Sequence, residues 1–579
     1  MSRTQRRMEN KQARLVQEAV RLGQHGPAGA GRHKDARLDE AGAQTNLGNA
    51  LRERGRLDEA VTCYRRAIGL KPDLAEAHSN LGNALQEQGR ADEAVPCLLT
   101  ALRLKPDYAH AHNNLGNAYK DQGHLEKAAA CYRTAIGLVP DYAHAHNNLG
   151  NTLWEQGHLD EAGACFRTAV RLMPDYAHAR SNLGSALEEQ GLLEEAASSL
   201  RAAIEIAPGY AHAHNNLANV LRRHRRLHEA VACYAKALEI QPDHAEAHFS
   251  LGTALLAQGH LAAGWAEYEW RWKTLQMAPL RRDVAQPQWR GEAAAGQTLL
   301  MHAEQGFGDT LQFCRYAGLA AARGLRVVMQ VQAPLVRLLR TLPGIDRVVG
   351  PGEDLPAFDL HCPMLSMPLA LGTTVETIPS AASYLRADET QAAAWRERLA
   401  ASDIGGLRVG LVWAGDAGSH SPTQAATDRR RSLPPALLAP LIGLPGLRFF
   451  SLQKLGAAAP VDLPVSDFMA EMGDFADTAA LVANLDLVIS VDTAVAHLAS
   501  ALGKPVWLLD RYDACWRWLD GRRDSPWYPA LRLYRQQSPG DWVGVLAAVA
   551  RDLEGLAQGL PPITGPMTNR NIILPARGL

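Results

Sequence analysis

Residues 112–119 read His112-Asn-Asn-Leu-Gly-Asn-Ala-Tyr119, and this segment belongs to a pattern that returns every 34 residues. An Asn-Leu-Gly or Asn-Leu-Ala triplet begins at six positions with this spacing: Asn46, Asn80, Asn114, Asn148, Asn182 and Asn216. A second series keeps the same spacing: Pro72, Pro106, Pro140, Pro174, Pro208 and Pro242. A fixed period of this length is typical of stacked helical units, which expose an extended binding surface. The first half of the chain is therefore predicted to bind a partner.

Each unit is predicted to contain two helices. In the first unit, residues 41–74, apolar residues recur at spacings of three and four, which is the amphipathic helical period. A glycine lies between the two helices, at Gly55 in the first unit, and the proline ends the second helix because proline cannot continue one. Close crossing of the two helices requires a small residue in the second helix, and alanine recurs there at Ala60, Ala94, Ala128, Ala162, Ala196 and Ala230.

This pattern closely resembles tetratricopeptide repeats over residues 41–278, where seven units are expected. The seventh unit departs from it, because Gly264 and Arg271 replace alanines and the closing proline is missing. We interpret this unit as a transition into the next domain. Residues 1–40 have no assigned role, and a degenerate capping repeat is one interpretation of them.

Asparagine forms helices poorly, costing about half a kcal/mol relative to alanine, so its recurrence requires a reason. A second series lies three residues after the first and on the same helix face: Asn49, Asn83, Asn117, Asn151 and Asn219. We call the two series the amide ladder. The amides either bond to neighbouring helices or bind the backbone of an extended polypeptide. The second interpretation resembles O-linked N-acetylglucosamine transferases and implies a polypeptide partner at Asn46, Asn80, Asn114, Asn148, Asn182 and Asn216.

Composition excludes several classes of function. Sixty basic residues balance 61 acidic ones, so no net charge favours nucleic acid or an anionic membrane. No apolar run reaches the roughly 18 residues that a membrane span needs, and the N-terminus lacks the apolar core of a secretion signal. Five cysteines follow the repeat period and fit packing positions better than disulfides. We expect a cytoplasmic protein without a membrane span or a nucleic-acid partner.

One unit has an unusual turn. The sixth repeat carries Arg222-Arg-His-Arg-Arg226 where the other units have their glycine turn. We interpret this segment as a solvent-exposed basic turn, with an anion site as the alternative.

The repeat ends near Gln286, and strands then alternate with helices. Buried strands are expected at residues 298–303, 326–331, 407–413, 447–452, 486–491 and 505–509. Such alternation indicates parallel sheets covered by helices. We predict two Rossmann-like domains, at residues 279–403 and 404–560, followed by a tail at 561–579. Ligands are expected in the interdomain cleft, beyond the carboxyl ends of the strands.

The segment Asp492-Thr493-Ala494-Val-Ala-His497 follows a predicted strand and opens a helix. Asp or Thr at this position caps a helix, and the exposed N–H groups also form an anion site suited to a diphosphate. The segment resembles the Asp-Thr-Gly-x-x-His-x-Ala signature of heptosyltransferase-like glycosyltransferases, with Ala494 in place of the glycine.

Two further motifs resemble the same family. Gly306-Phe-Gly308-Asp309 matches its Gly-Asp turn, which implies that Asp309 is the general base, whereas a turn or cap residue is the alternative. Arg431-Ser-Leu-Pro matches a basic element that implies contact with the donor phosphates. Together the motifs imply a GT-B type fold, with the acceptor side at residues 279–403 and the nucleotide-sugar side at 404–560. The resemblance implies that the donor is bound by Gly306, Gly308, Arg431, Asp492, Thr493, Ala494 and His497. We predict no metal, since an arginine side chain would supply the positive charge that a metal ion supplies elsewhere. We also predict no cofactor, since the nucleotide sugar is a co-substrate.

The expected function is inverting, metal-independent transfer of a sugar from a nucleotide-sugar donor to an acceptor hydroxyl, on a polypeptide presented by the repeats. Two alternatives remain: a non-catalytic repeat scaffold with a degenerate GT-B domain, and a sugar-nucleotide epimerase. The aromatic cluster of Trp516, Trp518 and Trp527 either packs in the core or stacks on a base or sugar.

Overall fold

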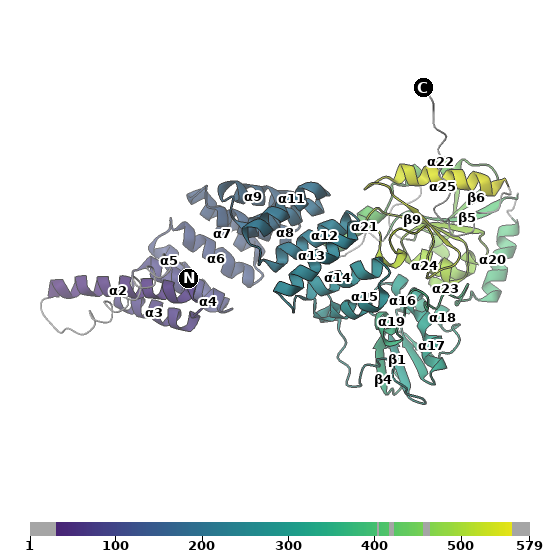
Figure 1. Cartoon of the computed structure of the whole chain (residues 1–579), viewed down its shortest axis with the longest axis horizontal. Helices are drawn as coiled ribbons and strands as arrows, with labels where there is room; N and C mark the ends of the chain where they lie inside the picture. The colour runs from purple at the N-terminus through teal and green to yellow at the C-terminus, as the bar shows by residue number, and fades with distance from the viewer. Residues whose placement is uncertain (1–29, 402–404, 416–421, 455–463, 559–579) are drawn as a thin grey trace, which may run out of the picture. The chain divides into compact units, whose positions relative to one another are not determined.

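The computed structural model describes residues 30–401, 405–415, 422–454 and 464–558, and these residues fall into two compact units, 1–209 and 210–579. The first unit consists of helix pairs, in line with the predicted repeats (Figure 1). Its helices are α2 (Ala30–Glu53), α3 (Leu57–Leu70), α4 (Ala75–Glu87), α5 (Ala91–Leu104), α6 (Ala109–Asp121), α7 (Leu125–Leu138), α8 (Ala143–Glu155), α9 (Leu159–Leu172), α10 (Ala177–Glu189) and α11 (Leu193–Ile206). The first helix begins at Ala30, so part of the unassigned N-terminal segment is helical.

The glycine of each Asn-Leu-Gly triplet is required because an aromatic or leucine side chain lies against its Cα. A Cβ on Gly116 would stand 2.6 Å from the Tyr132 ring, and one on Gly82 would stand 2.5 Å from Leu98. Real Cβ atoms do not approach other atoms this closely. The alanines of the second helices are likewise fully buried: Ala60, Ala94, Ala128, Ala162, Ala196 and Ala230. The predicted close crossing of the paired helices is therefore observed.

The second unit contains the last two repeats and an α/β region. Its repeat helices are α12 (Ala211–Arg223), α13 (Leu227–Ile240), α14 (Ala245–Ala257) and α15 (Leu261–Tyr268). The transition after α15 is built around Arg271, whose fully buried side chain forms ion pairs with Glu269 (2.6 Å) and Glu304 (3.1 Å). The arginine that broke the repeat pattern thus joins the last repeat to the segment after the first strand.

The first sheet is parallel, with strand order β3-β2-β1-β4. Its strands are β1 (Thr298–His302), β2 (Arg326–Gln330), β3 (Arg347–Val349) and β4 (Leu360–Pro363). Its helices are α16 (Phe307–Phe313), α17 (Ala317–Ala322), α18 (Val336–Leu339) and α19 (Met367–Ala370), and α20 (Glu389–Ala401) leads to the next sheet. β1 lies in the middle of the sheet, so the loop after its carboxyl end opens at the sheet's centre.

The second sheet has six parallel strands in the order β10-β9-β8-β5-β6-β7. The strands are β5 (Leu407–Val412), β6 (Leu447–Ser451), β7 (Val465–Asp467), β8 (Leu487–Val491), β9 (Val506–Asp510) and β10 (Leu531–Arg535). The helices are α21 (Pro422–Arg431), α22 (Ala439–Ile442), α23 (Phe475–Val482), α24 (Ala494–Ala501) and α25 (Trp542–Ala557). A helical solenoid followed by parallel α/β sheets confirms the predicted fold class.

A continuous apolar core joins the seventh repeat to both sheets. Trp265 of α15 packs edge-on against Trp516 at 5.1 Å, and both side chains belong to the core cluster that includes β1 and β8. Trp518 and Trp527 are fully buried in the same cluster. The aromatic cluster therefore packs in the core. Among the described residues, no helix is long and apolar enough to cross a membrane.

The basic turn of the sixth repeat contacts the second α/β domain. Arg225 has a φ of 60° at the position where the other units have glycine, and it bonds to Asp520 at 2.6 Å. Arg223 is buried and lies 3.9 Å from Asp513, while the Tyr512 hydroxyl donates a hydrogen bond to the His224 carbonyl at 3.5 Å. The interpretation as a solvent-exposed turn is wrong, because acidic groups around β9 and β10 bind these arginines.

Candidate functional site

Asp309 lies in the first turn of α16, directly after β1. Its Oδ2 accepts a hydrogen bond from the Gly306 N–H at 3.1 Å, which caps the helix. Its Oδ1 accepts one from a guanidinium nitrogen of Arg517. The capping role considered as the alternative is thus present, and both carboxylate oxygens are engaged in the ligand-free protein.

Arg517 is the residue of this site that the sequence did not indicate. It lies in a short 3-10 helix, Trp516–Trp518, and its guanidinium stacks over the Trp516 ring at 4.3 Å. Its Nη1 donates to the Cys515 sulfur at 3.0 Å. The nearby charge of Asp309, with smaller contributions that include Asp492, outweighs burial and raises the pKa of Arg517 above its ordinary value. Arg517 therefore stands as a fixed cation among the carboxylates of the site.

The second motif lies where β8 ends and α24 begins. Thr493 occupies the N-cap position, but its side chain makes no capping hydrogen bond among the described residues; its hydroxyl instead lies 3.0 Å from that of Ser490. Capping, the simpler explanation for this segment, does not account for it. The N–H groups of Ala494 and Val495, the first two of α24, have no hydrogen-bond partner in the part of the chain that the structure describes, whereas the Ala496 N–H donates to the Thr493 carbonyl at 3.1 Å. Such a helix start suits an anion, which the helix dipole favours.

His497 links the two motifs. Its Nδ1 lies 2.9 Å from the Tyr528 hydroxyl, its Nε2 lies 3.8 Å from Asp492, and its ring stacks on Trp518 at 5.3 Å. Burial lowers the pKa of His497 to about 3, so the imidazole is neutral. A Cβ on Gly308 would stand 2.9 Å from the His497 ring and 3.7 Å from the Ala494 Cα, and α16 packs against α24 (Figure 1).

Arg431, the last residue of α21, contacts the segment between β8 and α24. Its Nη1 donates a hydrogen bond to the Asp492 carbonyl at 3.0 Å, and its guanidinium also contacts the Asp428 carboxylate. Its Nε is buried and has no hydrogen-bond partner among the described residues. A Cβ at Gly415 would stand 2.3 Å from this Nε, so Gly415 leaves the room that the guanidinium occupies.

The structure therefore brings all the predicted α/β site residues together. Contacts run from Arg431 to Asp492, from Asp492 to His497, from His497 to Gly308, and from Asp309 to Gly306. No single sequence motif contains this arrangement, because the residues come from two sheets.

A buried carboxylate next to the site was also missed by the sequence reasoning. Glu304 follows β1 and accepts hydrogen bonds from the Arg271 guanidinium and from the Leu365 N–H at 3.0 Å. Burial outweighs the neighbouring Arg271 and raises the pKa of Glu304 to about 7. The segment after β1 is thus attached to the seventh repeat by an ion pair.

The amide ladder forms hydrogen bonds between repeats. Asn148 Nδ2 donates to Asn113 and Asn117 (both 3.1 Å), Asn182 Nδ2 donates to Asn147 (2.9 Å) and Asn151 (3.0 Å), and Asn80 Nδ2 donates to Asn49 (2.9 Å). Asn114 Nδ2 lies 3.5 Å from the Ser79 hydroxyl, Asn216 Oδ1 accepts from Asn215 at 3.3 Å, and Asn46 is exposed. The interhelical interpretation is therefore observed, and peptide binding at these six residues stays a prediction.

Three amides of the first series are partly exposed. Asn80, Asn148 and Asn182 are half-buried, and each uses its Nδ2 in the bonds between repeats. The tyrosines of the second helices hold the other series in place, as when the Tyr132 hydroxyl donates to Asn117 at 2.7 Å. Within the described ranges, no three His, Cys, Asp or Glu side chains are grouped in the way that a metal ion requires. Metal independence stays a prediction.

Comparison with known proteins finds separate matches in the two halves of the chain. A family model of the cilia and flagella-associated protein 70 C-terminal domain, a tetratricopeptide-type region, matches residues 6–247. A tetratricopeptide repeat model matches residues 233–266. The model of glycosyltransferase family 9 (heptosyltransferase) matches residues 468–509, which include β8, α24 and β9. The predicted resemblance to repeats joined to a heptosyltransferase-like region is thus confirmed, whereas these matches do not show a resemblance to O-linked N-acetylglucosamine transferases.

A curated relative, protein FlbA of Caulobacter vibrioides, is 29% identical over 333 residues, or 53% of this chain and 54% of FlbA. The chain therefore spans about half the length of this relative. Among solved structures, the Cut9–Hcn1 assembly of the APC/C is 20% identical over 37% of this chain and 43% of that chain, with a TM-score of 0.36. YrrB, described as a TPR protein with an unusual peptide-binding site, is 27% identical over 32% of this chain and 95% of its own, with a TM-score of 0.27.

Proposed function

We propose that this protein is a glycosyltransferase that moves a sugar from a nucleotide-sugar donor to a hydroxyl group of a polypeptide. The observation that carries the proposal is the meeting of two segments from different sheets, where Gly308 lies against His497. Because Asp309 follows Gly308 and Ala494 opens α24, this contact supports one site that holds the Asp309 carboxylate and the first N–H groups of α24. The match to the heptosyltransferase model covers the α24 side of that site.

The proposed reaction begins with the acceptor hydroxyl at Asp309. The hydroxyl oxygen forms a bond to the anomeric carbon, the bond from that carbon to the donor phosphate breaks, and its electron pair leaves with the nucleoside diphosphate. Asp309 takes the hydroxyl proton. Because one Asp309 oxygen caps α16 and the other contacts Arg517, Arg517 has to release the carboxylate before the proton moves.

Two arginines and one helix terminus are suited to the negative charge on the leaving diphosphate. Arg431 lies over Asp492 with its Nε free of partners among the described residues. The N–H groups at the start of α24 add partial positive charge, and Arg517 supplies a further cation once the diphosphate takes the place of Asp309 as its partner. Arg431 and the helix terminus stay in place, and fixed positive groups of this kind stabilise developing charge without rearranging. We propose that neither a metal nor a cofactor takes part.

The repeats are the proposed acceptor-binding region. The seventh repeat contributes directly to the site, because the Tyr268 hydroxyl accepts a hydrogen bond from Gln305 at 3.2 Å and the Tyr268 ring packs against Trp516 at 5.9 Å. A polypeptide bound along the final repeats would therefore approach Asp309. Each amide in the ladder adds only about 1 kcal/mol when it bonds a peptide group, so binding would require several repeats and would show little sequence preference.

The first test replaces Asp309 with asparagine, which keeps the shape of the side chain and removes its capacity to accept a proton. We expect Asp309→Asn to abolish release of nucleoside diphosphate from the donor while the nucleotide still raises the melting temperature. Asp354→Asn is the matched control, because Asp354 is an exposed carboxylate of the same domain. Transfer at the wild-type rate by Asp309→Asn would eliminate Asp309 as the base.

The second test locates the donor. ADP, UDP, GDP and CDP are added separately, and thermal unfolding of the intact chain is followed. A nucleotide at 100 times its dissociation constant stabilises its site by roughly 2.7 kcal/mol. We expect one base to raise the melting temperature and Arg431→Ala to remove the shift. Arg448→Ala, which changes an arginine of the neighbouring strand β6, should leave the shift intact. An equal shift in Arg431→Ala would place the nucleotide elsewhere.

A non-catalytic scaffold is the second candidate, and the engagement of both Asp309 oxygens favours it. The two candidates differ in one product. A scaffold releases no nucleoside diphosphate from any nucleotide sugar, whereas a transferase releases it in step with modification of the polypeptide.

A further inference from the structure

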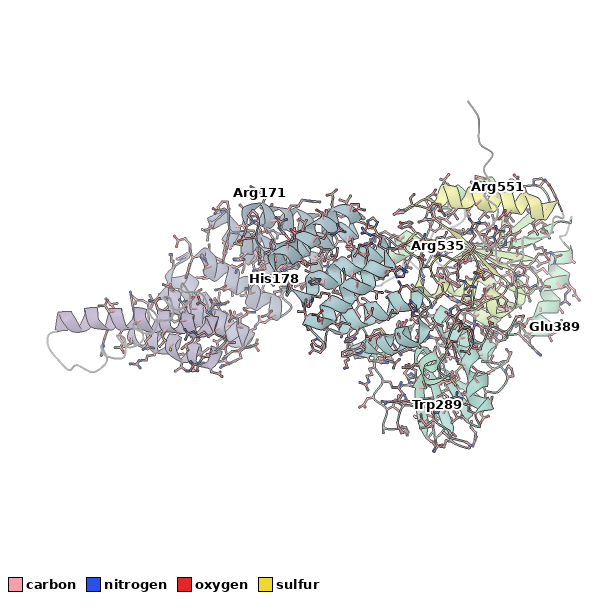
Figure 2. All side chains as sticks on the ribbon, in the orientation of Figure 1. Arg171, His178, Trp289, Glu389, Arg535 and Arg551 are labelled. Atoms are coloured by element: carbon pink, nitrogen blue, oxygen red, sulfur yellow. The ribbon has the colours of Figure 1, made fainter. Side chains whose placement is uncertain are left out.

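A cationic cavity lies in the last α/β domain. It has a volume of about 520 Å³ and is lined by β10, by α25, by the loops before and after β10 and by the turn of the sixth repeat. Six arginines line it, and we call it the arginine pocket: Arg225, Arg522, Arg523, Arg532, Arg535 and Arg551. Figure 2 labels Arg535 on β10 and Arg551 on α25. None of the predicted donor-site residues lines it.

Four of the arginines form ion pairs within the protein. Arg225 pairs with Asp520 at 2.6 Å, and Arg522 pairs with Asp524 at 2.6 Å. The other two pairs are Arg532 with Asp552 and Arg535 with Asp510, both at 2.7 Å. These pairs hold the walls of the pocket in place, so the guanidinium groups are fixed before any ligand arrives.

The remaining two arginines carry the unbalanced charge. The side chains of Arg523 and Arg551 are exposed and form no ion pair or hydrogen bond among the described residues. Asp541, a further carboxylate of the lining, accepts a hydrogen bond from the Gly544 N–H at 2.8 Å and so caps α25, and among the described residues it forms no ion pair with either arginine. The pocket therefore has two cationic groups that face its interior without an internal counter-ion.

The identity of the cations indicates the class of ligand. A guanidinium is a planar fork of donors that matches the oxygens of phosphate in pairs, and it is always charged. A volume of about 520 Å³ falls in the range of small-molecule sites and exceeds what a single phosphate fills. We propose that the arginine pocket binds a phosphorylated small molecule through Arg523 and Arg551, at a site separate from that of the donor.

The alternative is that the arginines only join the sixth repeat to the α/β domain. Arg225 and its pair with Asp520 serve that purpose. Arg523 and Arg551 do not, because they come from the α/β domain itself and have no such partner among the described residues. Substitution of Arg523 and Arg551 therefore tests ligand binding while the pair of Arg225 with Asp520 stays in place.

The test is calorimetric titration of the full chain with inorganic pyrophosphate and, separately, with inorganic phosphate. We expect binding in the wild type and a loss of affinity of at least about tenfold in Arg523→Gln/Arg551→Gln, since two charge-assisted contacts are removed. The matched control is Arg103→Gln/Arg171→Gln, which removes two exposed arginines of the repeats and the same charge. Arg431→Ala should retain this binding.

Three results would overturn the proposal. The first is no binding of either probe to the wild type at about 1 mM, which corresponds to a free energy near −4 kcal/mol. The second is an equal affinity in the pocket variant and in the control variant. The third is loss of binding in Arg431→Ala with no loss in the pocket variant, which would assign the probe to the donor site. Because the donor test uses a different variant, failure of one proposal is distinguishable from failure of the other.

Discussion

Gly308 allows the two α/β domains to meet because it has no Cβ. The imidazole of His497 fills that space and stacks on Trp518. A neutral imidazole can lie there because its Nδ1 is bonded to Tyr528 and because burial opposes its charged form. The contact that builds the site is therefore also a point at which the fold responds to acid.

This response has a defined sign. The pKa of His497 falls from 6.5 to about 3 in the folded protein, so below pH 6.5 the unfolded chain binds a proton that the folded chain does not. The contribution of His497 to the free energy of unfolding is therefore fully present above pH 6.5, and it decreases as the pH falls toward 3. We expect His497→Gln to lessen the acid-induced drop in melting temperature. His302, whose pKa burial also lowers to about 3, keeps part of the drop.

The control for this measurement is His260→Gln, which changes an exposed histidine of the same compact unit. Melting curves recorded at several pH values should show the wild-type dependence in that control. If His497→Gln and the control lose melting temperature equally on acidification, the buried imidazole is not the source.

At the residue scale, the sequence located groups whose role follows from a local motif. Asp309, Arg431 and Asp492 each stand beside a strand end or a helix start, and their order along the chain indicated one site. Arg517 and Glu304 could not be found in this way. Arg517 is 208 positions from Asp309, and the buried environment of Glu304 depends on Arg271 of the preceding repeat region. Such pairs become visible only in the folded chain.

At the scale of elements, the turn of the sixth repeat has Arg225 where the other repeats have glycine, because this turn contacts the second α/β domain at Asp520. Glycine adopts a positive φ freely, as at Gly259 with φ 84°. Arg225 adopts φ 60° at a cost of about 1 kcal/mol. Its pair with Asp520 is partly exposed and so contributes at most about 1 kcal/mol. The two effects are of similar size and opposite sign.

This balance predicts that two substitutions of Arg225 differ in their effect on the free energy of unfolding. Arg225→Gly loses the ion pair and relieves the backbone, so the melting temperature should hardly change. Arg225→Ala loses the pair and keeps the backbone conformation, which should destabilise the unit by up to about 1 kcal/mol. Gly259→Ala, which introduces the backbone cost alone, should be destabilising by about 1 kcal/mol. Equal unfolding free energies for Arg225→Gly and Arg225→Ala in denaturant titrations would contradict this account.

The sequence predicted most elements and missed four strands for physical reasons. The predicted strands at residues 298–303 and 486–491 are apolar runs in the middle of their sheets. β3 has only three residues, Arg347–Val349, and β7 is equally short and lies at an edge. β4 and β10 are also edge strands, and β10 alternates polar and apolar residues. Short strands and edge strands carry little hydrophobic signal, and pairing with a neighbour defines them.

At the scale of the whole molecule, the compact division falls between Gly209 and Tyr210, inside the repeat array. The last repeat shares a core with the α/β region through Trp265 and Tyr268, and the sixth repeat contacts that region through the pair of Arg225 with Asp520. The preceding repeats form their own compact unit. The domain boundaries at residues 278, 403 and 560 are inferred from the sequence pattern, and they stay predictions.

This division predicts how a ligand affects unfolding. A nucleotide that binds at Arg431 should raise the melting transition of residues 210–579 and leave that of residues 1–209 unchanged, because a ligand stabilises only the unit that holds it. Scanning calorimetry of the intact chain resolves this if Trp fluorescence is recorded in parallel, since eleven of the chain's 12 tryptophans lie after residue 209. A shift of every transition by the same amount would indicate that the chain unfolds as one unit.

The repeated contact between a glycine and a ring or leucine has an evolutionary consequence. Gly82, Gly116, Gly150 and Gly184 make the same kind of close contact in four consecutive units. Unequal recombination between two copies would therefore join surfaces that already match, and the gene could gain or lose one copy without requiring compensating substitutions. The length of the array can therefore change by one whole repeat at a time. We expect relatives of this protein to differ in the number of repeats before they differ in the packing within a repeat.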